Sequence, residues 1–318
     1  MSKILVTGAT GFVGKHLVPE LISAGHEVRC VVSKNVNWLN TEQVVVDKLE
    51  CDPNWAEALS GIEVVIHLAA RVHVMKEKSK SVLEEYCKIN SIATKKLAEQ
   101  AAKHQVKRFI FLSSIKVNGE FTLKDMPFTE ESITQPEDLY GQSKLDAEYH
   151  LQAISQHTGL EVVIIRPPLI YGPHVKANFL KMLQLVKKGL PLPFGKVQNG
   201  RHLIYIGNLI SALCTVVTHP QAANQTYLVA DDNSLSLAQL ISLIGREMNV
   251  NVRLIPIPVR FMRGLFILLG LKNLNTRLFD HLEVSNNKIK SQLGWVPPVS
   301  STEGLSKTVK WYQREFNS

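Results

Sequence analysis

The chain has 318 residues, of which 45% are hydrophobic and 20% are charged, and its formal net charge is +8. These values are typical of a globular protein of one large or two associated domains, and they exclude a disordered or fibrous chain. The basic residues are spread along the sequence without dense runs, so we expect no nucleic acid as a partner.

Four cysteines lie far apart and form no C-x-x-C pattern; they are Cys30, Cys51, Cys87 and Cys214. We therefore expect neither a disulfide framework nor a metal site. The first predicted strand begins so early that we expect no signal peptide, and hence a cytoplasmic protein. The most apolar stretch, residues 261–271, is interrupted by Arg263 and is too short to span a bilayer, so we expect no integral membrane segment. We interpret this stretch as a buried or partner-facing helix, with contact to a membrane surface as the alternative.

The chain opens with a pattern of strand, glycine turn and helix. Residues 4–6 predict a buried parallel strand, and apolar residues recur at helical spacing over 13–22. The turn between them has the spacing G-x-x-G-x-x-G, which differs from the G-x-G-x-x-G of the standard fingerprint. Such a turn brings backbone N–H groups and a helix N-terminus to a pyrophosphate, although it can also be a simple tight turn. The predicted cofactor contacts here are Gly8, Thr10, Gly11, Phe12, Val13 and Gly14.

The second predicted strand, residues 26–32, bears on the choice of cofactor. An NAD site usually has an acid at or just after the end of this strand, bound to the ribose 2′-OH. This chain has Ser33 and Lys34 there instead, with Arg29 nearby in sequence. These residues could hold a 2′-phosphate. We therefore expect NADP or NAD as the cofactor, with NADP favoured.

Strand and helix patterns alternate through the first half of the chain. Further strands are predicted over residues 44–46, 63–70, 108–112 and 161–165, and helices over 88–104 and 140–155. Repeated β-α alternation predicts an α/β fold with a Rossmann-like doubly wound parallel sheet and ligands at the C-terminal ends of the strands. The strand over 63–70 ends in Leu68, Ala69 and Ala70, which suit close contact with a cofactor.

After Arg166 the composition changes. Proline and glycine become frequent and strands become rarer, although residues 226–230 are expected to return to the sheet. Residues 236–316 are predicted to be mostly helical. We therefore predict a dinucleotide-binding Rossmann domain over residues 1–167, to which 203–232 return. The smaller, mostly helical substrate-binding lobe is expected to comprise residues 168–202 and 233–318.

Tyr140 and Lys144 carry the predicted chemistry. They lie four residues apart in the helix over 140–155, so they share a face. A phenol has a pKa of about 10 and is a poor base at neutral pH. A neighbouring ammonium and an oxidised nicotinamide would both stabilise the phenolate, which could then exchange a proton with a sugar hydroxyl. Ser114 would hydrogen-bond the same substrate oxygen, and Lys144 could also donate to the cofactor ribose. A Tyr-x-x-x-Lys pair alone is usually a surface pair, so this interpretation depends on Ser114 and the glycine turn.

Together these motifs resemble the extended short-chain dehydrogenase/reductase superfamily in its NAD-dependent epimerase/dehydratase branch. The resemblance covers nearly the full length and is carried by residues 6–14, 67–70, 111–114, 140–144 and 165–173. It implies a homodimer and a UDP-sugar substrate. It also implies that Pro167 contacts the cofactor, that Asn178 and Arg201 meet the diphosphate of the nucleotide sugar, and that Phe194 packs near its base.

Within that branch, residues 70–75 and 113–119 resemble bacterial enzymes of surface-polysaccharide synthesis, including UDP-sugar 4-epimerases and UDP-4-keto-6-deoxy-N-acetylhexosamine 4-reductases. Arg71, His73 and Lys116 could line the sugar pocket, or they could be solvated loop residues. We interpret His67 as a core residue rather than a catalytic one.

The leading hypothesis is NAD(P)-dependent hydride transfer at C4 of a UDP-hexose derivative by a nucleotide-sugar 4-ketoreductase, because no acid follows the second strand. The alternative is a UDP-glucose or UDP-N-acetylglucosamine 4-epimerase, which would use the same Ser114, Tyr140 and Lys144. A non-catalytic dinucleotide-binding scaffold is the remote alternative, since it has no need of all three residues.

Overall fold

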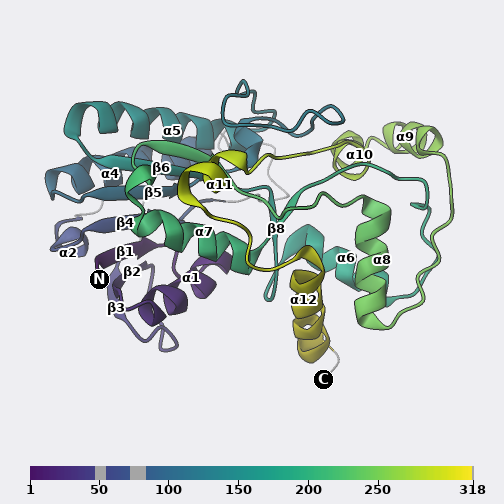
Figure 1. The fold of residues 1–318 in the computed structure, drawn as a ribbon, viewed down its shortest axis with the longest axis horizontal. Coiled ribbons are helices and arrows are strands. Elements are labelled where there is room, and N and C mark those ends of the chain that lie inside the picture. Colours follow the sequence, from purple (N-terminus) through teal and green to yellow (C-terminus); the bar gives the residue numbers. More distant parts are fainter. Residues whose placement is uncertain (47–54, 72–83, 317–318) are drawn as a thin grey trace.

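The computed structural model describes residues 1–46, 55–71 and 84–316 (Figure 1). Within these residues, seven parallel strands form the main sheet in the order β3-β2-β1-β4-β5-β6-β9. The doubly wound parallel sheet predicted from the sequence is therefore confirmed. The strands are β1 (Lys3–Thr7), β2 (Glu27–Val32), β3 (Glu42–Val45), β4 (Val64–His67), β5 (Arg108–Leu112), β6 (Glu161–Arg166) and β9 (Gln225–Leu228).

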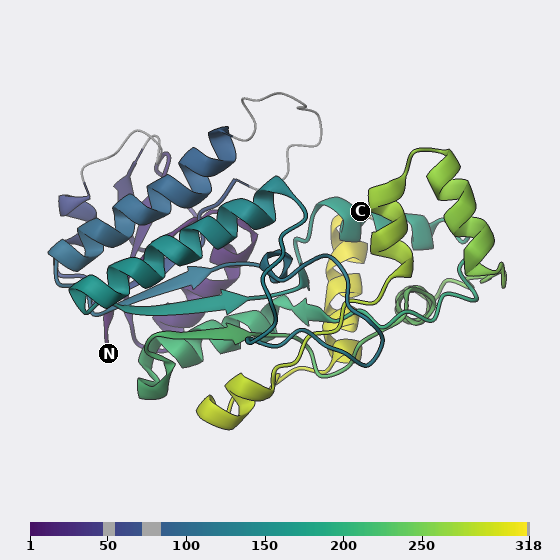
Figure 2. The same ribbon diagram turned by 90° about the horizontal axis from the view of Figure 1, so that it is seen from above.

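Helices cover both faces of this sheet. Figures 1 and 2 show α4 and α5 on one face and α1 and α7 on the other. A π-helix (Cys87–Ile92) leads directly into α4, and a short 3-10 helix (Ile115–Val117) follows β5. The helices that cover the sheet are α1 (Phe12–Ser23), α2 (Ala56–Leu59), α4 (Ala93–Lys103), α5 (Leu139–Thr158) and α7 (Ile206–Thr218).

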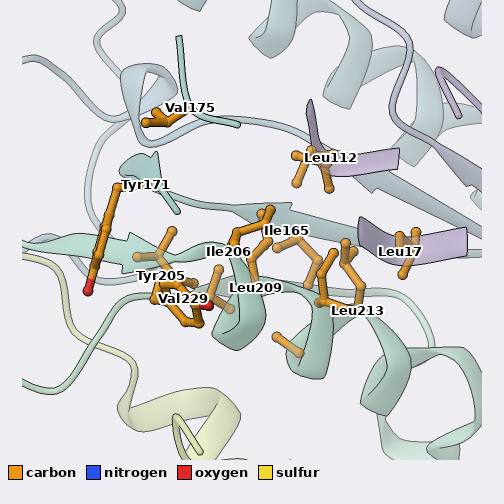
Figure 3. Packing of buried hydrophobic residues seen from close by; sticks show 14 of the residues in the cluster. Leu17, Leu112, Ile165, Tyr171, Val175, Tyr205, Ile206, Leu209, Leu213 and Val229 are labelled. Carbon is orange, nitrogen blue, oxygen red and sulfur yellow. The ribbon is translucent and has the colours of Figure 1, made fainter. Parts of the chain in front are cut away.

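The sheet has two hydrophobic cores because successive side chains of a strand point to opposite faces. Leu5 of β1 lies in one cluster with Leu97 of α4 and Leu151 of α5. Its neighbour Val6 lies in the other cluster with Leu17 of α1. Figure 3 shows part of this second cluster, including Leu112, Ile165, Leu209 and Leu213.

A small second sheet joins the main sheet to the rest of the chain. It pairs β7 (Leu169–Tyr171) with β8 (Leu203–Tyr205) in parallel, and α7 follows β8 directly. The buried carboxylate of Asp231 holds these elements together, because it accepts hydrogen bonds from the Tyr171 hydroxyl (2.9 Å), the Tyr205 backbone N–H (3.0 Å) and the Asn208 side chain (2.7 Å). Thus residues 203–205 pair with β7, while β9 returns to the main sheet beside β6. The division into two domains stays a prediction.

The C-terminal lobe is mostly helical. Its helix α8 packs against α6 and α12, and α9 packs against α10. Within the described residues, none of the helices is long and apolar enough to cross a membrane. The remaining helices are α6 (Ala177–Lys187), α8 (Leu237–Met248), α9 (Val259–Leu268), α10 (Lys272–Phe279), α11 (Asn287–Leu293), α12 (Ser301–Phe316) and a 3-10 turn (Pro220–Ala222).

Candidate active site

The predicted cofactor residues converge at one edge of the main sheet. All strands of this sheet are parallel, so their C-terminal ends share that edge. The glycine turn follows β1, Ser33 and Lys34 follow β2, and residues 68–70 follow β4. Ser114 and Pro167 lie just beyond the ends of β5 and β6, and the Ile115 backbone N–H donates to Pro167 O at 2.9 Å.

The glycine turn after β1 is tight. Gly8 has φ +72°, and a β-carbon on it would lie 2.7 Å from Ala69 N, so only glycine fits against the end of β4. A β-carbon on Gly14 would lie 2.4 Å from Gly8 O, which shows how closely α1 packs on the turn. Gly11 caps α1 without a side-chain hydrogen bond, and the first turn of α1 contains no acid. The free N–H groups and positive end of α1 fit a dinucleotide pyrophosphate.

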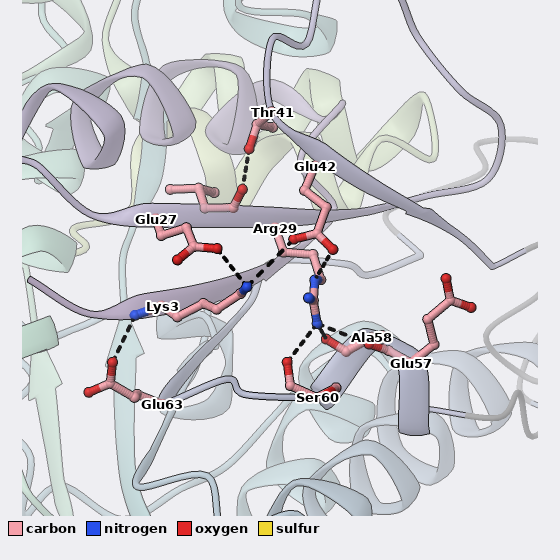
Figure 4. A network of polar contacts seen from close by, with 10 residues as sticks. Lys3, Glu27, Arg29, Thr41, Glu42, Glu57, Ala58, Ser60 and Glu63 are labelled. Carbon is pink, nitrogen blue, oxygen red and sulfur yellow. Dashed lines mark hydrogen bonds and ion pairs between the residues drawn. The ribbon is translucent and has the colours of Figure 1, made fainter.

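The end of β2 offers two exposed residues, Ser33 and Lys34, for the adenosine end of a cofactor. Arg29, which lies nearby in sequence, does not join them. Its buried guanidinium donates 2.9 Å hydrogen bonds to Glu57 O, Ala58 O and Ser60 O (Figure 4). Arg29 therefore caps the C-terminal end of α2, away from the ligand edge of the sheet.

His67 at the end of β4 is a buried structural residue. Its Nδ1 lies 2.7 Å from Thr7 Oγ1 and its Nε2 lies 2.9 Å from Thr94 Oγ1. Burial lowers the pKa of His67 to about 3, and the charge of Lys144 adds to this effect. The neutral ring thus joins β1, β4 and α4. Thr7 Oγ1 also accepts a hydrogen bond from Ala69 N at 3.3 Å, which fixes the start of the predicted cofactor segment.

Lys144 is almost fully buried beneath the end of β5. Its Nζ donates to Leu112 O at 2.7 Å and lies 4.4 Å from the centre of the Phe111 ring. Burial lowers its pKa from 10.5 to about 7, and the negative charge of Glu148 opposes this shift. Leu112 lies two residues before Ser114. Because the ammonium has three N–H donors, the bond to Leu112 O leaves donors for a ligand.

Tyr140 lies in the first turn of α5, half-buried, with its ring 6.4 Å from that of Tyr86. Burial raises its pKa above the ordinary value of 10.0, and Asp138 and Tyr86 add to the shift. The sequence predicts that a neighbouring ammonium favours the phenolate, but the groups that dominate here oppose ionisation. In the absence of other charges, Tyr140 is therefore a protonated phenol at neutral pH.

The turn after Ser114 packs directly on the start of α5. A β-carbon on Gly141 would lie 2.7 Å from Lys116 O, so glycine at this position allows the close approach. Asp138 caps α5 by accepting from Gly141 N at 2.7 Å, and its other oxygen pairs with Lys116 Nζ. Lys116 also pairs with Glu120 at 2.7 Å. Lys116 is thus tied to two carboxylates beside Tyr140 and orders the turn that carries Ser114, whereas the sequence predicts a sugar contact.

A buried polar network lies behind the predicted catalytic residues, and the sequence interpretation missed it. Glu148, one turn beyond Lys144 on α5, accepts from Ser113 Oγ and forms a two-point ion pair with Arg166, with Nε and Oε1 3.0 Å apart. Arg166 also donates to Asn118 Oδ1 at 3.1 Å. The i,i+4 spacing of Lys144 and Glu148 indicates that the two residues share a helix face. The spacing does not reveal Arg166, the partner of Glu148, which lies eighteen residues further along the chain.

Arg71 lies near the same edge and forms an ion pair. Its guanidinium meets Glu85 at 2.6 Å, and its backbone exchanges two hydrogen bonds with the Asn90 side chain. Asn90 also donates to Ser143 Oγ at 3.1 Å, which links this loop to α5. His73, the other predicted pocket residue of this loop, lies outside the described residues.

The predicted substrate residues of the lobe are spread over several elements. Arg201 donates to Asp280 O at 3.0 Å and to Thr276 O at 3.4 Å, and burial lowers its pKa to about 10 against the opposing charge of Asp280. It is therefore cationic at neutral pH. Asn178 is exposed in the first turn of α6, and Phe194 packs between two apolar clusters. Among the described residues, no hydrogen bond or ion pair joins Asn178 to Arg201.

Comparison with known proteins identifies the family. A model of the NAD dependent epimerase/dehydratase family matches residues 4–230. The chain is 40% identical over 316 residues to a UDP-glucose 4-epimerase of Vibrio cholerae, covering 99% of this chain and 96% of that protein. It is also 27% identical over 343 residues to a dTDP-glucose 4,6-dehydratase of Haemophilus influenzae, covering 100% and 99%.

Solved structures resemble the whole chain. A UDP-glucose 4-epimerase of Thermotoga maritima, solved with UDP-glucose, matches with a TM-score of 0.79 and 26% identity, covering 98% of this chain and 99% of that chain. A UDP-glucuronic acid 4-epimerase of Bacillus cereus, solved in complex with NAD, matches with a TM-score of 0.79 over 99% of both chains. At 20% identity, the second match shows likeness of fold alone.

Proposed function

This chain belongs to the NAD dependent epimerase/dehydratase family, and from that premise we propose that it is a UDP-hexose 4-epimerase. The observations that carry the proposal are the bond of Lys144 to Leu112 O at 2.7 Å, at the end of β5, and the close packing of the turn after Ser114 on the start of α5, where Tyr140 lies. The full-length relative that is a UDP-glucose 4-epimerase supports a UDP-hexose as the substrate.

The proposed reaction oxidises C4 and then reduces it from the other side. Tyr140 takes the proton of the C4 hydroxyl while hydride leaves the same carbon, and Ser114 holds the C4 oxygen by a hydrogen bond. A bound dinucleotide would supply the hydride acceptor and donor and a positive charge that favours the phenolate. The resulting 4-keto sugar turns its opposite face to the returning hydride, and Tyr140 gives back the proton. No net oxidation occurs.

The cofactor is proposed to bind along the C-terminal edge of β1, β2 and β4. The glycine turn would hold the pyrophosphate on the N-terminus of α1. Lys144 would donate from its remaining N–H groups to the ribose hydroxyls, and Pro167 would contact the nicotinamide. Asn178 and Arg201 would meet the sugar-nucleotide diphosphate and Phe194 its base. A homodimer is also proposed, and the molar mass of the purified protein in solution tests it.

Incubation of the purified protein with UDP-galactose, and separately with UDP-N-acetylgalactosamine, tests the epimerase. We expect the C4 epimer of at least one of them to appear in the proton NMR spectrum, with NAD as the only dinucleotide present. The proposal would be contradicted if C4 were inverted in neither sugar. The Tyr140→Phe protein is the control for contaminating epimerase.

A 4-ketoreductase of surface-polysaccharide precursor synthesis remains the second candidate, and the end of β2 favours it. Exposed Ser33 and Lys34 stand where an NAD site usually has an acid, and could hold a 2′-phosphate. Its test is oxidation of NADPH by UDP-4-keto-6-deoxy-N-acetylglucosamine. If this candidate is right, Lys34→Ala weakens binding of NADPH but not of NADH. The 4-ketoreductase would be excluded if the purified protein contained stoichiometric NAD and did not reduce this ketone.

A further inference from the structure

The helix α9 carries large apolar side chains on two neighbouring faces. Met262 and Phe266 on the inner face pack in a cluster with Phe279 of α10 and Val197. The α9 outer face consists of Phe261, Leu265 and Leu268, which follow the i, i+4, i+7 spacing of one helical stripe. These three side chains are 62%, 53% and 83% exposed. A helix that is apolar on both sides is normally covered on both sides.

The exposed apolar side chains of the described residues concentrate around this helix. Eight of the large ones lie within residues 255–274, among them Ile267, Leu269 and Leu274. Elsewhere they are scattered along the chain. Figures 1 and 2 show α9 at the outer end of the lobe, far from β3 and the main sheet. The α9 outer face is therefore a protruding apolar surface that the other described residues leave uncovered.

The segment that carries this face has basic residues and no acidic ones. Between Glu247 and Asp280 the sequence contains no acidic residue and five basic ones, at positions 253, 260, 263, 272 and 277. Arg263 pairs with Asp280, and Arg277 lies 3.9 Å from Glu120. Arg253 and Arg260 are exposed, and the Arg260 guanidinium lies 5.2 Å from the centre of the Phe261 ring. Positive charge thus borders the apolar stripe.

We propose that the α9 outer face binds the surface of an anionic lipid bilayer. The ten residues of α9 span about 15 Å, half of the roughly 30 Å hydrocarbon core, so the helix would lie along the surface and not across it. Its apolar stripe would enter the boundary between headgroups and acyl chains, and the exposed Arg253 and Arg260 would meet lipid phosphates. A second copy of the chain fits less well, because a two-fold contact would bring two basic surfaces together. This inference does not depend on the proposed function.

Flotation with vesicles of defined composition tests the proposal. Wild-type protein is mixed with vesicles of phosphatidylcholine alone, or of equal parts phosphatidylcholine and phosphatidylglycerol. We expect about tenfold stronger binding to the anionic vesicles, because each basic residue near the surface contributes to affinity. The double variant Leu265→Ser/Leu268→Ser should lose at least about tenfold in affinity. Arg253→Glu/Arg260→Glu should remove the preference for phosphatidylglycerol.

A matched control separates this face from exposed apolar residues in general. Leu123 and Ile133 are 64% and 86% exposed but lie outside the lobe helices, so Leu123→Ser/Ile133→Ser should float like wild type. Thermal melting confirms that each variant is folded. Absence of wild-type flotation, or equal flotation of Leu265→Ser/Leu268→Ser, would overturn the proposal. The face would instead bind a second copy of the chain if two results were found together. These are a wild-type dimer that does not float, and conversion of that dimer to a monomer by Leu265→Ser/Leu268→Ser.

Discussion

Tyr140 is surrounded by groups that oppose its ionisation. Burial, Asp138 and Tyr86 all raise its pKa above 10.0. A base at this position therefore needs the positive charges of the loaded site. Without them, the phenol keeps its proton and stays inactive as a base. This is a reason to expect that Tyr140 acts as a base only when the oxidised cofactor is in place.

Tyr140→Phe should reduce the rate of C4 inversion by about 10²–10⁴-fold, because it removes the group that exchanges the proton. Dinucleotide affinity and the melting temperature should change little, since the ring remains. Tyr149→Phe is the matched control, because Tyr149 lies on the same helix but is 56% exposed. Equal activity of Tyr140→Phe and wild type in the NMR assay would exclude Tyr140 as the proton carrier.

Lys144 should make the stability of the free protein depend on pH. Its pKa is about 7 when folded and 10.5 ordinarily, so the unfolded chain binds more protons between these values. The cost of burying the ammonium is fully present below pH 7 and disappears as the pH rises toward 10.5. The free energy of unfolding of wild type should therefore rise from pH 7 to 9 relative to Lys144→Met, as measured by urea denaturation. Exposed Lys95→Met should follow wild type; parallel curves for wild type and Lys144→Met would refute this.

Glu148 should contribute to both stability and the charge of Lys144. Its carboxylate is 1% exposed and pairs with Arg166, so Glu148→Gln should cost about 3–5 kcal/mol of unfolding free energy. The pKa of Lys144 should fall further, because Glu148 opposes its shift. Glu99→Gln breaks the exposed pair with Lys95 and should cost less than about 1 kcal/mol. Similar denaturation midpoints for the two variants would show that the buried network is dispensable.

The sequence indicates the candidate catalytic residues of this site more clearly than the buried residues that surround them. Tyr140 and Lys144 stand out because one helical turn separates them, a local relation that spacing reveals. Glu148 and Arg166 meet only because α5 packs beside β6, which no local pattern encodes. Lys116 was interpreted as a residue of the sugar pocket or a solvated loop residue. Asp138 and Glu120 bind its ammonium, a pairing that was not predicted because both carboxylates lie outside helices and strands, where the sequence has no periodic signal.

At the scale of elements, the glycine turn and α1 form one unit. Gly14→Ala would place a carbon 2.4 Å from Gly8 O, and such overpacking costs about 1–3 kcal/mol. The turn would also move away from the pyrophosphate, so NAD and NADPH should both bind more weakly in calorimetric titrations. Gly264→Ala is the control, because no atom beyond its chain neighbours and the backbone of its own helix lies within 4 Å of its added carbon. Unchanged affinity in Gly14→Ala would disconnect this turn from the cofactor.

The presence of a strand was easier to predict from the sequence than the exact ends of an element or its irregular segments. The strand over 108–112 has the predicted bounds, because its apolar run is buried on both faces. The strand over 63–70 ends early, at His67, since the backbone beyond it turns to meet Thr7 and Gly8. The helix over 88–104 is already α-helical at residues 84–86 and contains a π-helix at Cys87–Ile92, a change in hydrogen bonding that hydrophobic periodicity does not register.

At the scale of the whole molecule, one parallel sheet explains why distant segments converge on a single edge. Alternation of strands and helices predicts this arrangement, because parallel strands require crossovers. The lobe was predicted only as mostly helical, and its contacts with the sheet were not. The stretch 261–271 was interpreted as buried or partner-facing; only Met262 in it is buried, and most of its other large apolar side chains are exposed. Its partner is the lipid surface in our proposal.

The proposed epimerase requires hydride transfer at C4, and a deuterium label at this carbon follows that hydride directly. UDP-glucose carrying deuterium at C4 is incubated with the protein and NAD in ordinary water, and the product is examined by NMR and mass spectrometry. We predict UDP-galactose that keeps the deuterium at C4, because the same hydride leaves and returns. Product with hydrogen at C4, or no inversion while a 4-keto UDP-sugar is reduced with NADPH, would contradict the epimerase.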